Sequence, residues 1–162
     1  MSSSMTTYYH VSTLPLVTGN VIAPGNWGRI INCYSAQNGN PWMMARELAF
    51  ELVRATEFPD RPGRFSSAFL FETSDAAQKH RSEQTPWGMI YEVELSDPQA
   101  LTFRAAYNLT PYPPPQTAHL PVFVQNARAY WAGEEITTPE ILTKSPLRVT
   151  GFLSTGPWSY QP

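Results

Sequence analysis

The 162-residue sequence contains one cysteine, two lysines and no long hydrophobic run. The single cysteine, Cys33, excludes a disulfide within the chain and a cysteine-based metal cluster, as is usual in a reducing compartment. We expect it to be a small buried hydrophobic residue. No stretch approaches the ~18 apolar residues of a membrane span, and residues 1–7 lack the pattern of a secretion signal. We therefore expect a cytoplasmic protein that does not contact the membrane.

Charge is also scarce, because only 15% of the residues are charged and the net charge is -2. Proteins that hold nucleic acid by bulk electrostatics need clustered lysines and arginines, so the composition argues against that class. Nine of the 11 basic residues are arginines, whose guanidinium can form paired hydrogen bonds to phosphate or carboxylate groups. This preference for arginine is compatible with the binding of a small anionic ligand.

Length and composition predict one folded domain over residues 1–162, with 42% hydrophobic residues. Short β-branched and aromatic segments separated by turns are expected to be strands. They are residues 7–11, 29–32, 66–73, 88–95, 101–106, 121–125 and 147–153. Together with a few helices, this order predicts an α+β fold with mostly antiparallel sheets. No glycine-rich segment matches a phosphate-binding or dinucleotide-binding loop.

The clearest helix is predicted over residues 41–57, where Pro41 suits the first helical position. Apolar residues recur four apart, at Met44, Leu48 and Leu52, and should face the core. We interpret the charged residues on the other side as a solvated face: Arg46, Glu47, Glu51 and Arg54. A shorter helix, capped by the Ser74 hydroxyl, is expected to follow.

Metal binding and common nucleophilic chemistry find no support in the sequence. His10, His80 and His119 are isolated, without a second histidine or a carboxylate at the spacing of metal ligands. No serine lies in a nucleophile-elbow motif, and Cys33 lacks a catalytic signature. We expect no metal site.

Five segments, in this order, resemble the small ADP-ribosyltransferase fold: YYHVS, L-x-x-G-N-V-I-x-P-G, FLFETSDAA, IYEVE and SPLRVTGFL. They are similar to motifs of the rifamycin ADP-ribosyltransferases. An uncharacterised bacterial domain family with a YHVS start and a PGNWGRII segment is also similar. The resemblance covers most of residues 8–153. It implies two small, mostly antiparallel sheets that form a cleft for NAD, flanked by helices.

In that family, a histidine, an aromatic residue and usually an acid support transfer of ADP-ribose from NAD with release of nicotinamide. The resemblance places His10 on the histidine that holds a ribose of NAD, and Val11 and Ser12 on the clamp for the nicotinamide amide. It places Phe69 where an aromatic ring, normally tyrosine, stacks on nicotinamide. Phe71, two residues on and on the same sheet face, is the competing choice.

The acid is assigned to Glu135, four residues before Pro139 and adjacent to Glu134, because other branches of the fold carry a glutamate in a similar position. Asp97 is the alternative. A carboxylate that binds the ribose 2'-hydroxyl favours the positive charge that develops as the glycosidic bond breaks. Two arginines that follow glycines, Arg29 and Arg64, are candidates for the NAD diphosphate.

Purely structural roles stay open for all these residues: a histidine satisfied within a sheet, core phenylalanines, surface arginines and a solvated acidic turn. The acceptor of ADP-ribose stays open as well, and is a protein, a nucleic acid or a small molecule. The family includes toxins and defence effectors, so a cognate inhibitor protein is a further expected partner. The alternative function is a catalytically degraded module of the same fold that binds a nucleotide or a protein.

Overall fold

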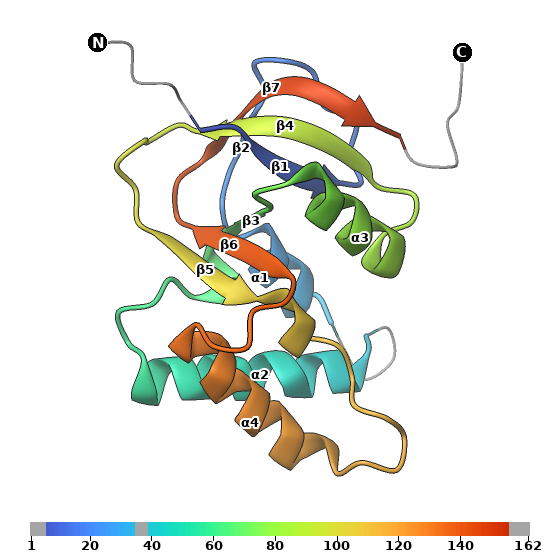
Figure 1. The fold of residues 1–162 in the computed structure, drawn as a ribbon, viewed down its shortest axis with the longest axis vertical. Coiled ribbons are helices and arrows are strands. Elements are labelled where there is room, and N and C mark those ends of the chain that lie inside the picture. Colours follow the sequence, from blue (N-terminus) through green and yellow to red (C-terminus); the bar gives the residue numbers. More distant parts are fainter. Residues whose placement is uncertain (1–5, 35–38, 156–162) are drawn as a thin grey trace.

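Two antiparallel sheets form the framework of the protein (Figure 1). The computed structural model describes residues 6–34 and 39–155. The larger sheet has the strand order β1-β4-β7-β2, and the smaller sheet has the order β3-β6-β5. The strands are β1 (Tyr8–Ser12), β2 (Val21–Ile22), β3 (Ala68–Leu70), β4 (Met89–Leu95), β5 (Thr102–Ala106), β6 (Pro139–Thr143) and β7 (Leu147–Ser154). This architecture confirms the predicted α+β class with antiparallel sheets.

Helices cover the outer faces of the sheets. They are α1 (Asn26–Asn32), α2 (Pro41–Glu57), α3 (Ser74–Gln84) and α4 (His119–Ala132), with the short 3-10 helices η1 (Arg64–Ser66) and η2 (Tyr107–Leu109). In Figure 1, α2 and α4 cross below the smaller sheet, and α3 lies beside the larger sheet. Among the described residues no helix is both long and apolar enough to cross a membrane.

The smaller sheet is buried on both faces. Neighbouring residues of β6 point to opposite sides, so Ile141 and Leu142 belong to different apolar clusters. Leu142 packs with Phe50 of α2 and Trp131 of α4. Ile141 packs with residues of the larger sheet, including Tyr91. The smaller sheet therefore forms the middle layer of the protein.

A single bridge joins the two sheets at their edges. The Tyr9 N–H donates to the Phe71 carbonyl at 2.9 Å, and the Phe71 N–H donates to the Tyr9 carbonyl at 2.8 Å. The bridge places the β1 residues after Tyr9 beside the β3 residues before Phe71. Two of the predicted site residues, His10 and Phe69, are brought together in this way.

Helix α2 spans the predicted range 41–57, but it buries a different face. Leu48 and Leu52 are 59% and 63% exposed, whereas Arg46 and Glu47 are buried. The prediction of a solvated face is therefore wrong for Arg46 and Glu47. The four-residue spacing fits a helix in either orientation, and charged partners from distant segments decide which side is buried.

Two segments expected to be strands are helical. Residues 121–125 belong to α4, whose buried residues Phe123, Ala127, Tyr130 and Trp131 follow a helical spacing. Residues 29–32 lie in α1. A β-carbon at Gly28 of α1 would collide with the Phe65 carbonyl, so this helix depends on close contact with η1, which the local sequence does not reveal. Strand β6, which was not predicted, begins at Pro139.

Two smaller expectations are also corrected. The N-cap of α3 is Thr73, whose side chain accepts from the Ala76 N–H at 3.2 Å, and not Ser74. Cys33 at the end of α1 is exposed rather than buried.

Candidate functional site

A cavity of about 490 Å³ lies where the two sheets meet. Strands β1, β2, β3 and β6 contribute to its wall. Helices α1, α2 and α3 and both 3-10 helices also contribute residues. Its lining also includes Leu14 and Trp87, both 65% exposed, so the cavity opens to solvent beside them. Most of the predicted site residues line it: His10, Val11, Ser12, Arg64, Phe69 and Phe71.

His10 has a fixed tautomer. Its Nδ1 lies 2.8 Å from the Phe69 carbonyl oxygen. Because a carbonyl only accepts hydrogen bonds, Nδ1 carries the proton and Nε2 is left as an acceptor. Burial lowers the pKa of His10, although the bond to Phe69 acts in the opposite direction, and the imidazole is therefore neutral at pH 7. His10 can accept a hydrogen bond from a ligand hydroxyl.

The residues after His10 are less free to bind a ligand through their side chains. The Ser12 hydroxyl donates to the Leu14 carbonyl at 3.3 Å and accepts from the Leu14 N–H at 3.1 Å. Both hydrogen bonds of the Ser12 hydroxyl are therefore made within this local turn. Val11 and Ser12 still line the cavity, and their backbone is the part available to a ligand.

Phe69 and Phe71 both line the cavity. Phe69 is partly buried, and the Arg64 Cζ lies 4.9 Å from its ring centroid. Phe71 is fully buried against the His80 ring, with centroids 4.9 Å apart. Phe69 is therefore the more accessible of the two for stacking on a planar ligand.

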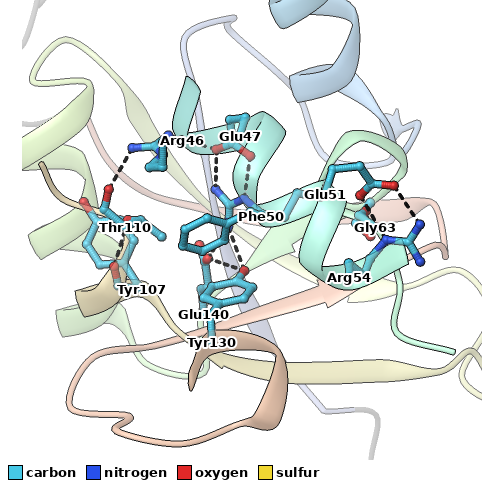
Figure 2. Close-up of polar contacts among 12 residues, drawn as sticks. Arg46, Glu47, Phe50, Glu51, Arg54, Gly63, Tyr107, Thr110, Tyr130 and Glu140 are labelled. Carbon is cyan, nitrogen blue, oxygen red and sulfur yellow. Dashed lines mark hydrogen bonds and ion pairs between the residues drawn. The ribbon is translucent and has the colours of Figure 1, made fainter. Parts of the chain in front are cut away.

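Four charged residues from three segments form a buried ionic cluster: Arg46, Glu47, Arg64 and Glu140. All of them except Glu47 line the cavity. Figure 2 shows the polar contacts in this region. Arg64 donates through Nε and Nη2 to the Glu47 carboxylate, at 2.9 and 3.1 Å. Its Nη1 donates to Glu140 Oε1 at 2.7 Å. Arg46 donates to Glu47 Oε1 and to the Thr110 carbonyl, both at 2.8 Å.

Tyr130 completes the ionic cluster from α4. Its hydroxyl donates to Glu140 Oε1 at 2.7 Å and accepts from Arg64 Nη1 at 2.7 Å. Burial raises the pKa of Tyr130 well above its ordinary range, so the hydroxyl stays protonated. Burial by itself would raise the pKa of Glu47, but the guanidinium groups of Arg64 and Arg46 outweigh this effect and lower it. Two positive and two negative charges thus balance inside the protein.

The two predicted diphosphate ligands are placed differently. Arg64 lines the cavity, but its guanidinium is already bound to Glu47, Glu140 and Tyr130. Arg29 lies on α1, is exposed and donates to the Pro24 carbonyl at 3.3 Å. It is not among the residues that line the cavity.

The structure does not bring Glu135 to the cavity. It lies in an exposed turn with a φ of 54°, and its carbonyl accepts from Asn108 Nδ2 at 2.8 Å. Glu140, five residues later on β6, lines the cavity and is only 2% exposed. The sequence carried one usable signal for it, since Glu140 directly precedes the apolar residues Ile141 and Leu142. Local sequence predicts no strand there, so the direction of its side chain does not follow from the sequence.

Another part of the cavity lining contains buried polar atoms without hydrogen-bond partners. Among the described residues these atoms are Trp27 Nε1 on α1, His80 Nδ1 on α3 and Thr85 Oγ1 directly after α3. All three residues line the cavity, and we call them the unpartnered wall. A buried polar atom without a partner typically costs about 1 to 3 kcal/mol. Their concentration around one cavity makes it the candidate site for a polar ligand.

A metal ion has no evident place in this site. Within residues 6–34 and 39–155, no group of three or more histidine, cysteine, aspartate or glutamate side chains is arranged to hold one.

Comparison with known protein families gives one match. Residues 8–154 match a family described as "Protein of unknown function (DUF2441)". No curated protein matches the chain at a significant level.

Proposed function

The chain belongs to this family, DUF2441, and we propose that it binds NAD in the cavity, cleaves the bond between nicotinamide and ribose, and transfers ADP-ribose to an acceptor. The observation that carries the proposal is the meeting of His10, Phe69 and Glu140 in one cavity. They come from three strands of two sheets. They supply the neutral imidazole, the aromatic face and the carboxylate that the resemblance to ADP-ribosyltransferases implies.

Each of the three side chains has a role that its surroundings allow. Nε2 of His10 is an acceptor for a ribose hydroxyl, because Nδ1 is bound to the Phe69 carbonyl. The Phe69 ring offers a face for the nicotinamide ring. Glu140 replaces Glu135 as the proposed acid. Its Oε1 is held by Arg64 and Tyr130, which leaves Oε2 for the ribose 2'-hydroxyl.

The proposed reaction breaks the C1'–N bond, and the bonding electron pair passes to the nicotinamide ring, which leaves uncharged. An acceptor hydroxyl or amine, or water, attacks C1' and loses a proton. The ribose passes through an oxocarbenium-like state, which a nearby carboxylate stabilises. The buried position of Glu140 strengthens this interaction, because the surroundings exclude water.

The arginines suggest where the diphosphate lies. Arg46 and Arg64, the arginines that line the cavity, are balanced by Glu47 and Glu140. A diphosphate placed against them would compete with these carboxylates. We therefore expect it near the open side of the cavity, bound by backbone N–H groups. The acceptor stays undefined, as a protein, a nucleic acid or a small molecule, and so does a role as a bacterial toxin or defence effector with a cognate inhibitor protein.

A second candidate function is a module that binds a nucleotide without cleaving it. Two observations favour it. Phe69 lacks the hydroxyl that tyrosine would supply, and Glu140 Oε1 already accepts two hydrogen bonds. A carboxylate tied into a structural network is less free to follow the charge that develops during bond cleavage.

The test incubates the purified protein with NAD labelled in its adenylate part and follows nicotinamide release and label transfer to protein, RNA, DNA and small molecules. Glu140→Gln and Glu135→Gln form a matched pair, since only Glu140 lines the cavity. We expect a loss of about 10² to 10³ in turnover for Glu140→Gln and none for Glu135→Gln. Thermal unfolding of both variants checks that each one folds.

Binding of NAD, measured by calorimetry, separates the remaining outcomes. NAD binding without release of nicotinamide would favour the binding module. Neither binding nor release would overturn both candidates. Equal activity of Glu140→Gln and the unaltered protein would remove Glu140 from the mechanism.

A further inference from the structure

The function proposed above uses His10, Phe69 and Glu140, but it leaves the second histidine of the cavity lining, His80, without a role. His80 projects from α3 and lines the cavity. Its ring packs between Phe71 and Tyr107, with ring centroids 4.9 and 5.1 Å away. Its Nδ1 is buried and has no hydrogen-bond partner within residues 6–34 and 39–155.

The other candidate bases of the cavity are already engaged. Nδ1 of His10 donates to the Phe69 carbonyl, and its remaining nitrogen is assigned to a ribose hydroxyl. Glu140 Oε1 accepts hydrogen bonds from Arg64 and Tyr130. His80 differs from both because its aromatic neighbours position the ring without using either nitrogen.

The charges around His80 suit a group that gains and loses a proton. Burial lowers the pKa of His80, and the electrostatic interactions with His10 and with the Arg64 guanidinium act in the same direction, so the ring is neutral at pH 7. The carboxylates of Glu140 and Glu83 act in the opposite direction and would stabilise an imidazolium once it forms. Besides these four groups, Tyr107 faces the ring from η2, and its hydroxyl donates to Glu83 Oε2 at 3.1 Å.

We propose that His80 is the general base of the transfer reaction, an inference that rests on the function proposed above. As the acceptor hydroxyl, amine or water attacks C1' of the ribose, its proton passes to a nitrogen of the neutral imidazole. The electron pair of the breaking C1'–N bond leaves with nicotinamide. The imidazolium then returns its proton to solvent near Glu83 of α3, whose side chain is 42% exposed. No further reactant is needed.

The test uses His80→Phe, which keeps an aromatic ring between Phe71 and Tyr107 but cannot take a proton. If His80 only fills space, this variant should be fully active. If it is the base, kcat should fall about 10² to 10³-fold, within the range typical of general bases. The affinity for NAD, measured by calorimetry, should stay within twofold. The substitution removes a buried nitrogen that has no hydrogen-bond partner, so the melting temperature should stay the same or rise.

The pH profile of kcat gives a readout that packing does not affect. The unaltered protein should lose activity as the pH falls and His80 becomes protonated, and this acid limb should be absent in His80→Phe. Imidazole added to His80→Ala should restore part of the rate. His119→Phe is the control, since His119 lies outside the cavity lining, and it should leave both kcat and the acid limb unchanged.

Two outcomes overturn the inference in distinguishable ways. If the unaltered protein releases nicotinamide and His80→Phe keeps its rate and its acid limb, His80 is not the base, and the proposed function stands. If the unaltered protein releases no nicotinamide, the proposed function fails, and the role of His80 fails with it.

Discussion

The two walls of the cavity use polar groups in opposite ways. In the ionic cluster, Arg64 forms hydrogen bonds with Glu47, Glu140 and Tyr130, and every charge has an opposite partner. In the unpartnered wall, Trp27 and His80 each bury a nitrogen that no described group satisfies. A satisfied buried network holds its members in one arrangement, whereas an unsatisfied group keeps its capacity for another partner. The ionic cluster therefore stabilises the fold, whereas the unpartnered wall has polar groups available to a ligand of the kind proposed above.

The largest effect should follow from breaking the ionic cluster. Glu47→Ala leaves the Arg46 and Arg64 guanidinium groups buried without their shared carboxylate. Removing one partner of a buried pair typically costs about 3 to 5 kcal/mol, so the free energy of unfolding should fall by this amount in urea denaturation. Glu51→Ala is the matched control on the same helix, because it breaks an ion pair that is partly exposed to solvent. The side chain of Glu51 is 33% exposed, and that of its partner Arg54 is 18% exposed. That pair should contribute about 0.2 to 1 kcal/mol. Equal losses for the two variants would show that the ionic cluster is not structural.

The second prediction compares the same substitution at the two ends of α3. Thr85→Val removes a buried hydroxyl that has no partner and should stabilise the protein by about 1 kcal/mol. Thr73→Val removes the N-cap bond to the Ala76 N–H and should destabilise it by about 0.5 to 2 kcal/mol. Thermal unfolding measures both changes. Destabilisation by Thr85→Val would mean that its hydroxyl has a structural partner.

The third prediction concerns pH. Burial lowers the pKa of both His10 and His80 below the ordinary value of 6.5. The unfolded chain therefore binds more protons than the folded protein just below pH 6.5, and stability must fall as the pH drops through this window. It is regained above pH 6.5, where both forms are neutral. In melting curves between pH 7.5 and 5, His80→Phe should show a shallower decline than the unaltered protein. Parallel curves would contradict the prediction that His80 is neutral in the folded protein.

The smallest effect should come from the apolar residues that α2 exposes. Leu48→Gln should change the free energy of unfolding by less than about 0.5 kcal/mol, because the side chain is 59% exposed. Phe50→Ala, two residues along the same helix, should cost about 3 to 5 kcal/mol, because Phe50 is 1% exposed in the core. Urea denaturation of both variants checks the assignment of the helix faces. A large loss for Leu48→Gln would contradict it.

Several features of this fold could be predicted from local sequence. The α+β class, helix α2 and strands β1, β4, β5 and β7 follow from periodicity and turn residues. Residues 121–125 and 29–32 were misassigned because their β-branched and apolar side chains suit strands, while tertiary contacts favour helices. Of the predicted site residues, six line the cavity, whereas Arg29 and Glu135 do not.

Local sequence specifies the identity and order of the chemically useful groups: a histidine in the first strand, the Phe69–Phe71 pair and a small set of arginines and glutamates. The tertiary structure alone decided which of these groups are buried together. Glu47, Arg64 and Glu140 lie far apart along the chain, so no local pattern shows that they neutralise one another. Burial of an ion depends on where its counterion lies in space, and this is why Arg46 and Glu47 of α2 are inside while Leu48 and Leu52 are outside.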